Sequence, residues 1–533
     1  SISSSIVSVS TEVITQSPVS NIANALSGRL PGLTTMQQGG QPGDDAAVLY
    51  IRGQSSLTSN TPLYVIDGVE RSASLFIAMD PSEIESVTIL KDAAATAVYG
   101  SKAANGVVLV TSKRGLEGKT SISVNTSLTM QQFTRFPNYL DSYESLKLFN
   151  EAMMNDGNDP VYSEEELEHY RIQDDPYRYP NTDWYGEMMR KAAPQYNASI
   201  NIRGGSKTVR YFVAASYMKQ EGQLKTTPTR VYNPEFSHKR YRISSNVDAM
   251  ITKDFTLSVE LAGNLNSTQE PASGMDIFYR LNRMPPWAMP IINPDGSYAG
   301  TSEYQRSNPA YMLNTQGSNT RIRHNLTTAV KMDYNLRKLL KGLTLTLRGA
   351  FDFRYGTGKY WTERQSTYKL ISRQGRADRY TSYLKPVFFS PSTATGELST
   401  KRLDGLASLN YKNKFGNHRV ALMTIANVVN YVSSLDVPYN SVNFIGRVNY
   451  SYLNKYHVDF NASYRGSENF APGRRFGFFP AVSASWNLHE ENFMKKVSFI
   501  DRMKFRVSYG MTGNDYASTR FLYKEGKWLT NPT

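Results

Sequence analysis

The 533-residue sequence contains no cysteine, six histidines and no long apolar run. Without cysteine the chain forms no disulfide and offers no thiolate to a metal ion, while an oxidising compartment stays open. Its longest apolar-looking stretch, residues 420–432, is shorter and more polar than the roughly 20 residues of a membrane-spanning helix. These absences exclude a helical membrane protein and a disulfide-stabilised fold.

Positive charge is in excess, with a formal net charge of +14. Such a balance suits nucleic acid or an anionic membrane surface. No basic cluster of the kind that binds nucleic acid stands out, so we expect solvated charges on loops and no nucleic-acid partner. The 35 tyrosines are more informative, because tyrosine favours strands and the interfaces of a membrane with water.

Residues 1–117 are typical of a small α/β domain. The predicted helices span 21–30 and 91–99, and the predicted strands 47–52, 63–67 and 107–111. The stretch KDAAATAVYGSKAANGVVLVTSKRG contains Gly-Ser-Lys, but a phosphate loop follows a strand and precedes a helix, and here that order is reversed. We interpret the stretch as a helix of small residues, a turn at Gly100 or at Asn105-Gly106, and a strand buried on both faces.

From residue 118 onward apolar and polar residues alternate. In YHVDFNASYR, the apolar series begins at Tyr456 and the polar series at His457. We count about thirteen runs of about ten residues, each typical of a strand with one apolar and one polar face. Their connections are alternately long (133–193, 218–238, 268–320, 357–401) and mostly short. This asymmetry favours an outer-membrane barrel with apolar side chains toward lipid and polar side chains toward the lumen.

Particular segments carry a family resemblance. ALSGRLPG, IRG, PLYVIDGV and IESVTILKDAAATAVYGSKAANGVVLVTSKRG resemble the plug domain of SusC/RagA-type TonB-dependent outer-membrane transporters of Bacteroidetes. Segments at 181–206, 479–487 and 505–514 resemble barrel strands of the same family.

The resemblance implies a membrane β-barrel, 22-stranded in the family, with an N-terminal α/β plug domain inside its lumen. Residues 1–117 would be the plug domain, and residues 118–533 the N-terminal part of the transmembrane barrel. We expect the chain to be part of a longer one, because about thirteen strands would leave an open sheet edge in lipid. The TonB box, an N-terminal extension and the C-terminal strands would lie outside it.

The resemblance also implies a function, namely TonB-dependent active import of glycans (oligosaccharides), or alternatively of oligopeptides, across the outer membrane. Implied partners are a SusD-like surface lipoprotein that captures substrate, the TonB–ExbB–ExbD complex that supplies energy, and outer-membrane lipid. A secreted glycoside hydrolase and a surface adhesin are competing classes. Alternating strands and asymmetric loops argue against the hydrolase, and a plug argues against a passive barrel.

No catalytic set emerges from the sequence, so we predict no enzyme activity. The histidines lack metal-ligand spacing, and adjacent carboxylates such as Asp44-Asp45 cannot flank a glycosidic bond. We predict no cofactor and no metal, with a structural calcium ion at Asp44-Asp45 as the alternative. Ser163 and Glu166 are expected to form a helix capping box.

Aromatic residues in expected loops are candidate substrate contacts, because their faces stack on sugars and pack against apolar side chains. The candidates are Phe76 in a plug loop and Trp184, Trp287, Tyr360 and Trp361 in outer loops. The alternative is that these rings brace the loops or meet the partner lipoprotein. Within the plug, Arg52 and Asp67 are a candidate ion pair that rearranges during transport.

Overall fold

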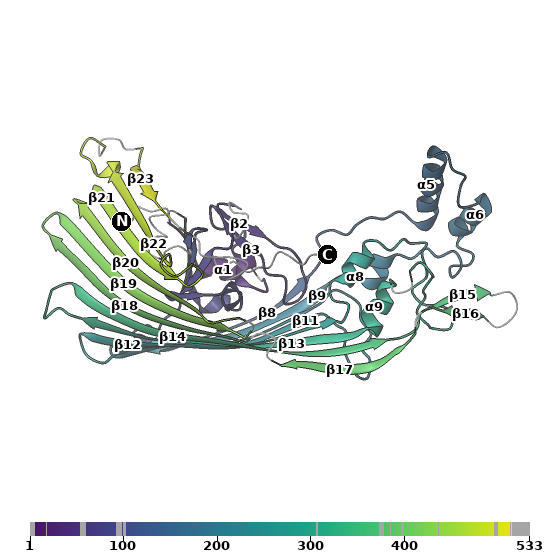
Figure 1. The fold of residues 1–533 in the computed structure, drawn as a ribbon, viewed down its shortest axis with the longest axis horizontal. Helices are drawn as coiled ribbons and strands as arrows, with labels where there is room; N and C mark the ends of the chain where they lie inside the picture. Colours follow the sequence, from purple (N-terminus) through teal and green to yellow (C-terminus); the bar gives the residue numbers. More distant parts are fainter. Residues whose placement is uncertain are drawn as a thin grey trace.

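The structure is a computed structural model. It describes residues 6–17, 19–53, 60–91, 99, 103–304, 307–372, 378–383, 385–395, 399–434, 436–494, 499–511 and 513. A small N-terminal domain lies against the concave side of a large curved sheet (Figure 1). The predicted helix over residues 91–99 lies outside the described residues, apart from Lys91 and Tyr99.

The N-terminal domain is built on a five-stranded sheet in the order β1-β6-β7-β4-β5. Strands β4 and β7 are parallel, and the other neighbours are antiparallel. These strands are β1 (Ile6–Ser10), β4 (Leu63–Ile66), β5 (Val69–Arg71), β6 (Ile84–Leu90) and β7 (Val107–Ser112). The other elements are β2 (Leu33–Met36), β3 (Val48–Ile51), α1 (Thr11–Thr15), α2 (Ile22–Ala25), α3 (Ala73–Ile77) and η1 (Pro81–Glu83).

One apolar core holds this domain together. Ile14 of α1, Phe76 of α3, Ile89 of β6 and Val108 of β7 all belong to it and are fully buried. Helices and strands that are too short to be stable alone therefore share one interior.

Strand β7 and the turn before it agree with the predicted turn and buried strand. Val107 and Val110 are fully buried in the middle of the sheet. Gly106 has a φ of 86°, and a Cβ at this position would lie 2.7 Å from the Cδ1 of Ile51. Both the backbone conformation and the close approach therefore require glycine.

The large sheet has 14 strands, in the order β23-β22-β21-β20-β19-β18-β14-β13-β12-β11-β10-β9-β8, with β17 paired to β14. All neighbours along this path are antiparallel. The strands are β8 (Gly118–Gln131), β9 (Ala193–Gly205), β10 (Val209–Glu221), β11 (Ser237–Met250), β12 (Phe255–Pro271), β13 (Gly317–Asn335), β14 (Leu343–Arg364), β17 (Val387–Thr395), β18 (Thr400–Phe415), β19 (His418–Ser433), β20 (Tyr439–Tyr452), β21 (Tyr456–Ser467), β22 (Phe476–Asn487) and β23 (Lys504–Gly510).

The exposure of the two faces of this sheet is the reverse of that in a soluble protein: the apolar face is exposed and the polar face is buried. On β12, Val259 and Leu261 are 40% and 47% exposed, whereas Ser258 and Glu260 are buried. On β21, Asp459 is buried between exposed apolar neighbours. The predicted pattern of apolar residues outward and polar residues inward is therefore confirmed for these strands.

Several strands are longer than the predicted ten residues. Strand β13 has 19 residues and β14 has 22. The extension of β14 also pairs with β17, through pairs such as Trp361 with Pro391. Tyr360 and Trp361 therefore lie in a strand, and their predicted location in a loop is wrong.

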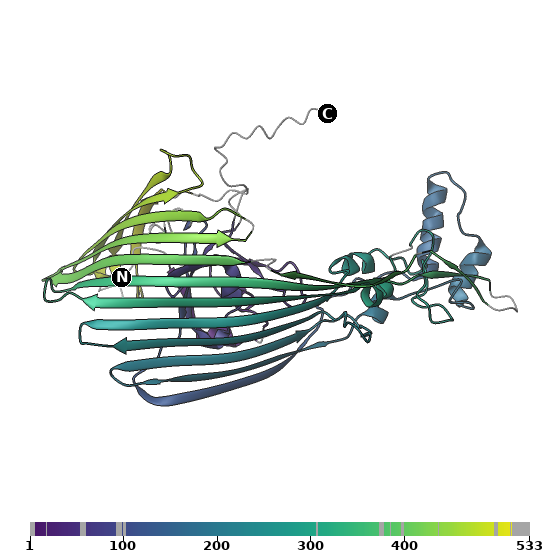
Figure 2. The ribbon, with the colours of Figure 1, turned by 60° about the horizontal axis from the view of Figure 1, so that its bottom comes forward.

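The connections are short at one end of the sheet and long at the other (Figure 2). The long ones contain α5 (Ser142–Asn155), α6 (Glu164–Ile172), α7 (Trp184–Met188), α8 (Asp276–Leu281), α9 (Pro309–Thr315), β15 (Tyr368–Ser372) and β16 (Arg379–Ser382), and η3 (Leu488–Glu490) follows β22. Ser163 and Glu166 form the predicted capping box of α6. No helix among the described residues is long and apolar enough to cross a membrane.

Candidate functional site

The contact between the N-terminal domain and the large sheet contains buried ion pairs. Glu83 is the last residue of the short helix η1, and the Asp80 carboxylate caps that helix by accepting a hydrogen bond from the Ser82 N–H. The Nε of Arg242 on β11 lies 2.9 Å from each Glu83 carboxylate oxygen. The Glu83 side chain is 2% exposed and the Arg242 side chain 8%. Burial raises the pKa of the Glu83 carboxyl, and the Arg242 guanidinium opposes that rise.

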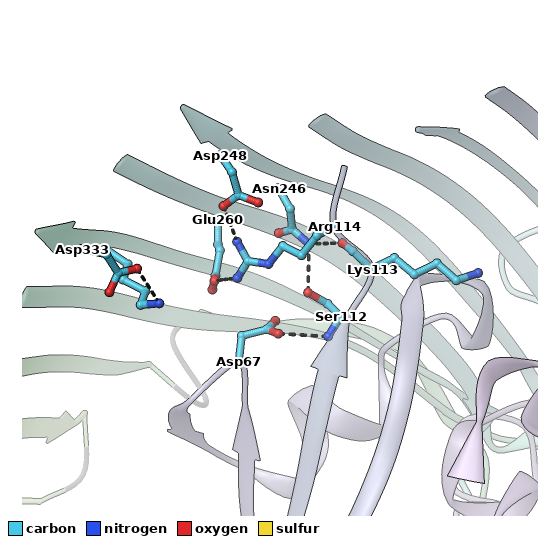
Figure 3. Close-up of polar contacts among 9 residues, drawn as sticks. Asp67, Ser112, Lys113, Arg114, Asn246, Asp248, Glu260 and Asp333 are labelled. Carbon is cyan, nitrogen blue, oxygen red and sulfur yellow. Dashed lines mark hydrogen bonds and ion pairs between the residues drawn. The ribbon is translucent and has the colours of Figure 1, made fainter. Parts of the chain in front are cut away.

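A second group gathers where β7 ends (Figure 3). Arg114 forms ion pairs with Asp248 of β11, at 3.1 Å, and with Glu260 of β12. The Asn246 side-chain amide donates to the Ser112 hydroxyl at 2.9 Å and to the Lys113 carbonyl at 2.8 Å. The chain that leaves β7 is thus held to two neighbouring strands of the large sheet.

A third group lies at β5. Arg71 pairs with Asp352 of β14 at 3.4 Å, and Glu70 pairs with Arg402 of β18 at 3.2 Å. Asp404 lies 3.3 Å from Arg348 and 3.6 Å from Arg402. Charged side chains from two parts of the chain, hundreds of residues apart, therefore meet in a mostly buried layer.

Two of the predicted substrate contacts are buried. Phe76 lies in α3 rather than in a loop, fully buried, with its ring 5.1 Å from that of Tyr64. Trp184 is 4% exposed at the start of α7, and its indole N–H donates to the Pro285 carbonyl at 3.1 Å. The predicted alternative for Trp184, bracing of the long connections, agrees with this position.

The remaining three aromatic candidates are partly exposed. Trp287 lies in the connection between β12 and β13, near Tyr162. Trp361 stacks on Phe389 of β17 with ring centroids 5.0 Å apart, and Tyr360 is the neighbouring residue of β14. Contact of these rings with substrate stays a prediction.

Arg52 and Asp67 occupy similar backbone positions. Both have positive φ, 63° and 51°, at the ends of β3 and β4. The Asp67 carboxylate accepts a hydrogen bond from the Ser112 N–H at 2.9 Å (Figure 3), and Arg52 is exposed. An ion pair between them stays a prediction.

The carboxylate of Asp45 is surrounded by donors. It accepts hydrogen bonds from the Ser20 hydroxyl, from the Asn21 amide at 3.3 Å and from the Gln220 amide at 3.0 Å. A calcium ion at Asp44-Asp45 stays a prediction.

The residues that join the two parts were not singled out from the sequence. A signal was nevertheless present, because Arg242, Asp248 and Glu260 all lie in the polar series of strands whose apolar series faces outward. A charge on the inner face of such a sheet requires a partner there.

Comparisons with known proteins agree with this architecture. The family model "TonB-dependent Receptor Plug Domain" matches residues 1–107. The chain is 29% identical to TonB-dependent receptor P26 of Formosa agariphila over 96% of its own length and 51% of that protein. It is 26% identical to TonB-dependent receptor SusC of Bacteroides thetaiotaomicron over 97% of its length and 52% of that protein.

Among solved structures, the RagAB peptide importer in its closed-closed state superposes with a TM-score of 0.76 at 20% identity, over 96% of this chain and 60% of the other. This likeness shows the fold. The chain spans about half the length of the curated relatives it matches. The matched plug, the inverted sheet around it and the similarity to SusC together assign the chain to the SusC/RagA type of TonB-dependent receptors, which are outer-membrane β-barrels with an internal plug.

Proposed function

We propose that the protein imports nutrients actively across the outer membrane, with energy supplied by TonB–ExbB–ExbD, and does not act as an enzyme. The proposal rests on the way in which the plug is held inside the curved sheet. An apolar core holds the plug together, whereas ion pairs such as Glu83–Arg242 hold it to the barrel. Hydrogen bonds beside open space, such as the one from Ser82 to Asn201, can be exchanged for water, so part of the plug can shift against the wall while its interior stays packed.

Glycans are the proposed substrates, captured first by a SusD-like lipoprotein. The resemblance to SusC/RagA-type transporters implies glycans or oligopeptides, and the partly exposed rings of Trp287, Tyr360 and Trp361 support glycans. Oligopeptides are the second candidate, because the RagAB structures that share this fold are those of a peptide importer.

The test is uptake by cells that carry the full-length protein and its lipoprotein. The probes are fluorescent maltohexaose, laminarihexaose and xylohexaose, and a labelled decapeptide mixture. We expect uptake of at least one glycan in a tonB-positive strain and none in its tonB-deleted sibling. Equal uptake in both strains would contradict active import, and uptake of the peptides alone would favour the second candidate.

The aromatic candidates are tested with a transported glycan. Trp287→Ala and Trp361→Ala should each weaken binding about fivefold if the rings stack on sugar, since an aromatic contact contributes about 1 kcal/mol. The Phe76→Leu variant is a matched control, because that side chain is buried in the plug core. An unchanged dissociation constant in both tryptophan variants would leave these rings with a bracing role.

A further inference from the structure

The outward face of the large sheet contains an apolar groove of about 610 Å³. The register places Phe444 of β20 and Tyr464 of β21 in one row across the sheet, and Gly446 and Ala462 in the next row. The two aromatic side chains are 49% and 47% exposed, so they rise above the small residues beside them. This face meets lipid in an outer-membrane barrel, and a hollow lined mainly by apolar groups does not hold water. We therefore expect hydrocarbon to fill the groove.

The groove climbs from one end of the sheet toward its middle. It begins at Leu345, two residues after the start of β14 at Leu343, and it reaches Tyr464, eight residues after the start of β21 at Tyr456. The difference of six residues is roughly 20 Å along a strand, or about 15 Å along the membrane normal for strands tilted by about 40°. One leaflet of the hydrocarbon core is also about 15 Å deep, half of about 30 Å. The groove therefore has the depth of one layer of acyl chains.

The foot of the groove lies beside the short connection between β13 and β14, residues 336–342, which we call the basic turn. Its sequence, LRKLLKG, contains Lys338 and Lys341, which are both exposed. Within the part of the chain that the structure describes, neither lysine forms an ion pair, whereas the neighbouring Arg337 pairs with Asp254 at 2.6 Å. The described acids thus leave two positive charges of the basic turn unneutralised, and such charges attract an anion.

Neighbouring side chains place the basic turn at the membrane surface. Tyr334 at the end of β13 is 44% exposed, and Tyr450 near the end of β20 is 36% exposed. Exposed tyrosines at strand ends are typical of the aromatic girdle at the level of the lipid headgroups. Leu339, in the basic turn itself, is 77% exposed, which suits insertion among lipids. Lysine side chains at this level reach the phosphate groups of the lipids.

We propose that the groove and the basic turn together bind one anionic glycerophospholipid of the inner leaflet, with its phosphate at Lys338 and Lys341 and an acyl chain in the groove. Short connections of an outer-membrane barrel face the periplasm, so the basic turn meets the inner leaflet. The positive charge of the turn selects an anionic lipid over an uncharged apolar partner. The site lies on the outside of the barrel and is independent of the proposed import.

The test is lipid binding by the purified full-length protein, measured by native mass spectrometry. Dioleoylphosphatidylglycerol and dioleoylphosphatidylcholine are titrated, because they share their acyl chains and differ in net charge. The Lys338→Gln/Lys341→Gln variant removes two charges from the basic turn. The matched Lys414→Gln/Arg419→Gln variant removes two charges at the same end of the sheet, from paired residues of the inward series of β18 and β19. Heat-modifiable gel mobility verifies that every variant is folded.

We expect the wild type to prefer phosphatidylglycerol over phosphatidylcholine by about 25-fold, about fivefold for each lysine at the membrane surface. Lys338→Gln/Lys341→Gln should lose this preference, whereas Lys414→Gln/Arg419→Gln should change it by at most about twofold. Equal binding of the two lipids by the wild type, or equal losses of preference in the two variants, would overturn the proposal.

Gly446→Leu tests the acyl-chain half of the site. A Cβ at Gly446 would meet no atom within 4 Å, so leucine enters the groove without disturbing the strand. Gly405→Leu is the matched control, because Gly405 has the same open space on the same outward face, outside the groove. Gly446→Leu should weaken binding of both lipids about tenfold, as expected when roughly ten carbon contacts are lost, and Gly405→Leu should leave it unchanged.

Two other occupants of the groove are outcomes of the same measurements. A wild-type dimer that Gly446→Leu converts to a monomer would assign the groove to a second copy of the chain. Tighter binding of lipopolysaccharide than of phosphatidylglycerol, lost in Lys338→Gln/Lys341→Gln, would assign it to the lipid of the other leaflet. Either result would overturn the proposal.

Discussion

Strands β11, β12, β14 and β18 form the ion-pair wall, and strands β8 and β9 form the hydroxyl wall. The two walls belong to one continuous sheet but contact the plug through different side chains. The ion-pair wall contacts the plug through charged side chains that are nearly excluded from water, such as Arg242 and Glu83. The hydroxyl wall leaves a cavity of about 540 Å³ and presents small neutral groups such as Ser123 and Asn201. The difference indicates that the contact beside the cavity is weaker than the buried ion pairs.

The two kinds of contact differ in the free energy needed to break them. Separating a buried ion pair leaves two poorly hydrated charges, whereas separating a hydroxyl from an amide beside a cavity that admits water exchanges one hydrogen bond for another. We therefore expect the contact between Ser82 and Asn201 to break more readily than the Glu83–Arg242 ion pair. Substitutions on either wall test whether the two contacts differ in strength.

The largest effect is expected from Glu83→Gln, which leaves the Arg242 guanidinium buried without its counter-charge. We expect the free energy that seats η1 and β6 against the wall to fall by about 3–5 kcal/mol. Hydrogen exchange of the backbone amides of Ile84–Leu90 in the purified full-length protein measures this change.

The control replaces both partners. Glu83→Met combined with Arg242→Met should recover most of the lost free energy, because apolar residues of similar volume remove the unpaired charge. If the double variant exchanges as fast as the single one, packing and not charge fixes the plug at this place.

An intermediate effect is expected at Arg114, which contacts Asp248 and Glu260. Its side chain is 29% exposed, so water takes over part of the lost interaction. Arg114→Gln should cost about 1–2 kcal/mol, measured by exchange of the amides of Val107–Ser112. Arg114→Lys should recover only part of it, because an ammonium does not reach two carboxylates as a guanidinium does. Equal exchange in wild type and Arg114→Gln would contradict an anchoring role.

Much of the fold was predictable because lipid imposes a simple rule on each strand. Val458 and Phe460 face outward and Asp459 faces inward, as the alternation of single residues requires. Loop positions were less predictable. Strand β14 continues through Tyr360 and Trp361 because it finds a partner in β17, and such pairing depends on a segment about 30 residues away.

The ion pairs between the plug and the sheet could not be predicted from the sequence, for a different reason. Glu83 and Arg242 are 159 residues apart, and only the seating of the plug inside the curved sheet brings them together. The sequence does indicate that each inward charge needs a partner, but the identity of that partner depends on the angle and depth of the plug. Phe76 shows the same limit, since a short apolar segment reads equally well as an exposed loop or a buried helix.

The smallest effect is expected on the hydroxyl wall. Ser82→Ala and Asn201→Ala each remove a 3.4 Å hydrogen bond beside a cavity, so the seating free energy should change by no more than about 0.5 kcal/mol. The matched substitution on the opposite side is Asn246→Ala, which removes a buried hydrogen bond of 2.9 Å and a partly buried one of 2.8 Å and should cost about 1–3 kcal/mol. Hydrogen exchange of plug amides on both sides compares the three variants. Equal losses of seating free energy in the three variants would mean that both walls hold the plug with similar strength. The inferred difference between the two walls would then be wrong.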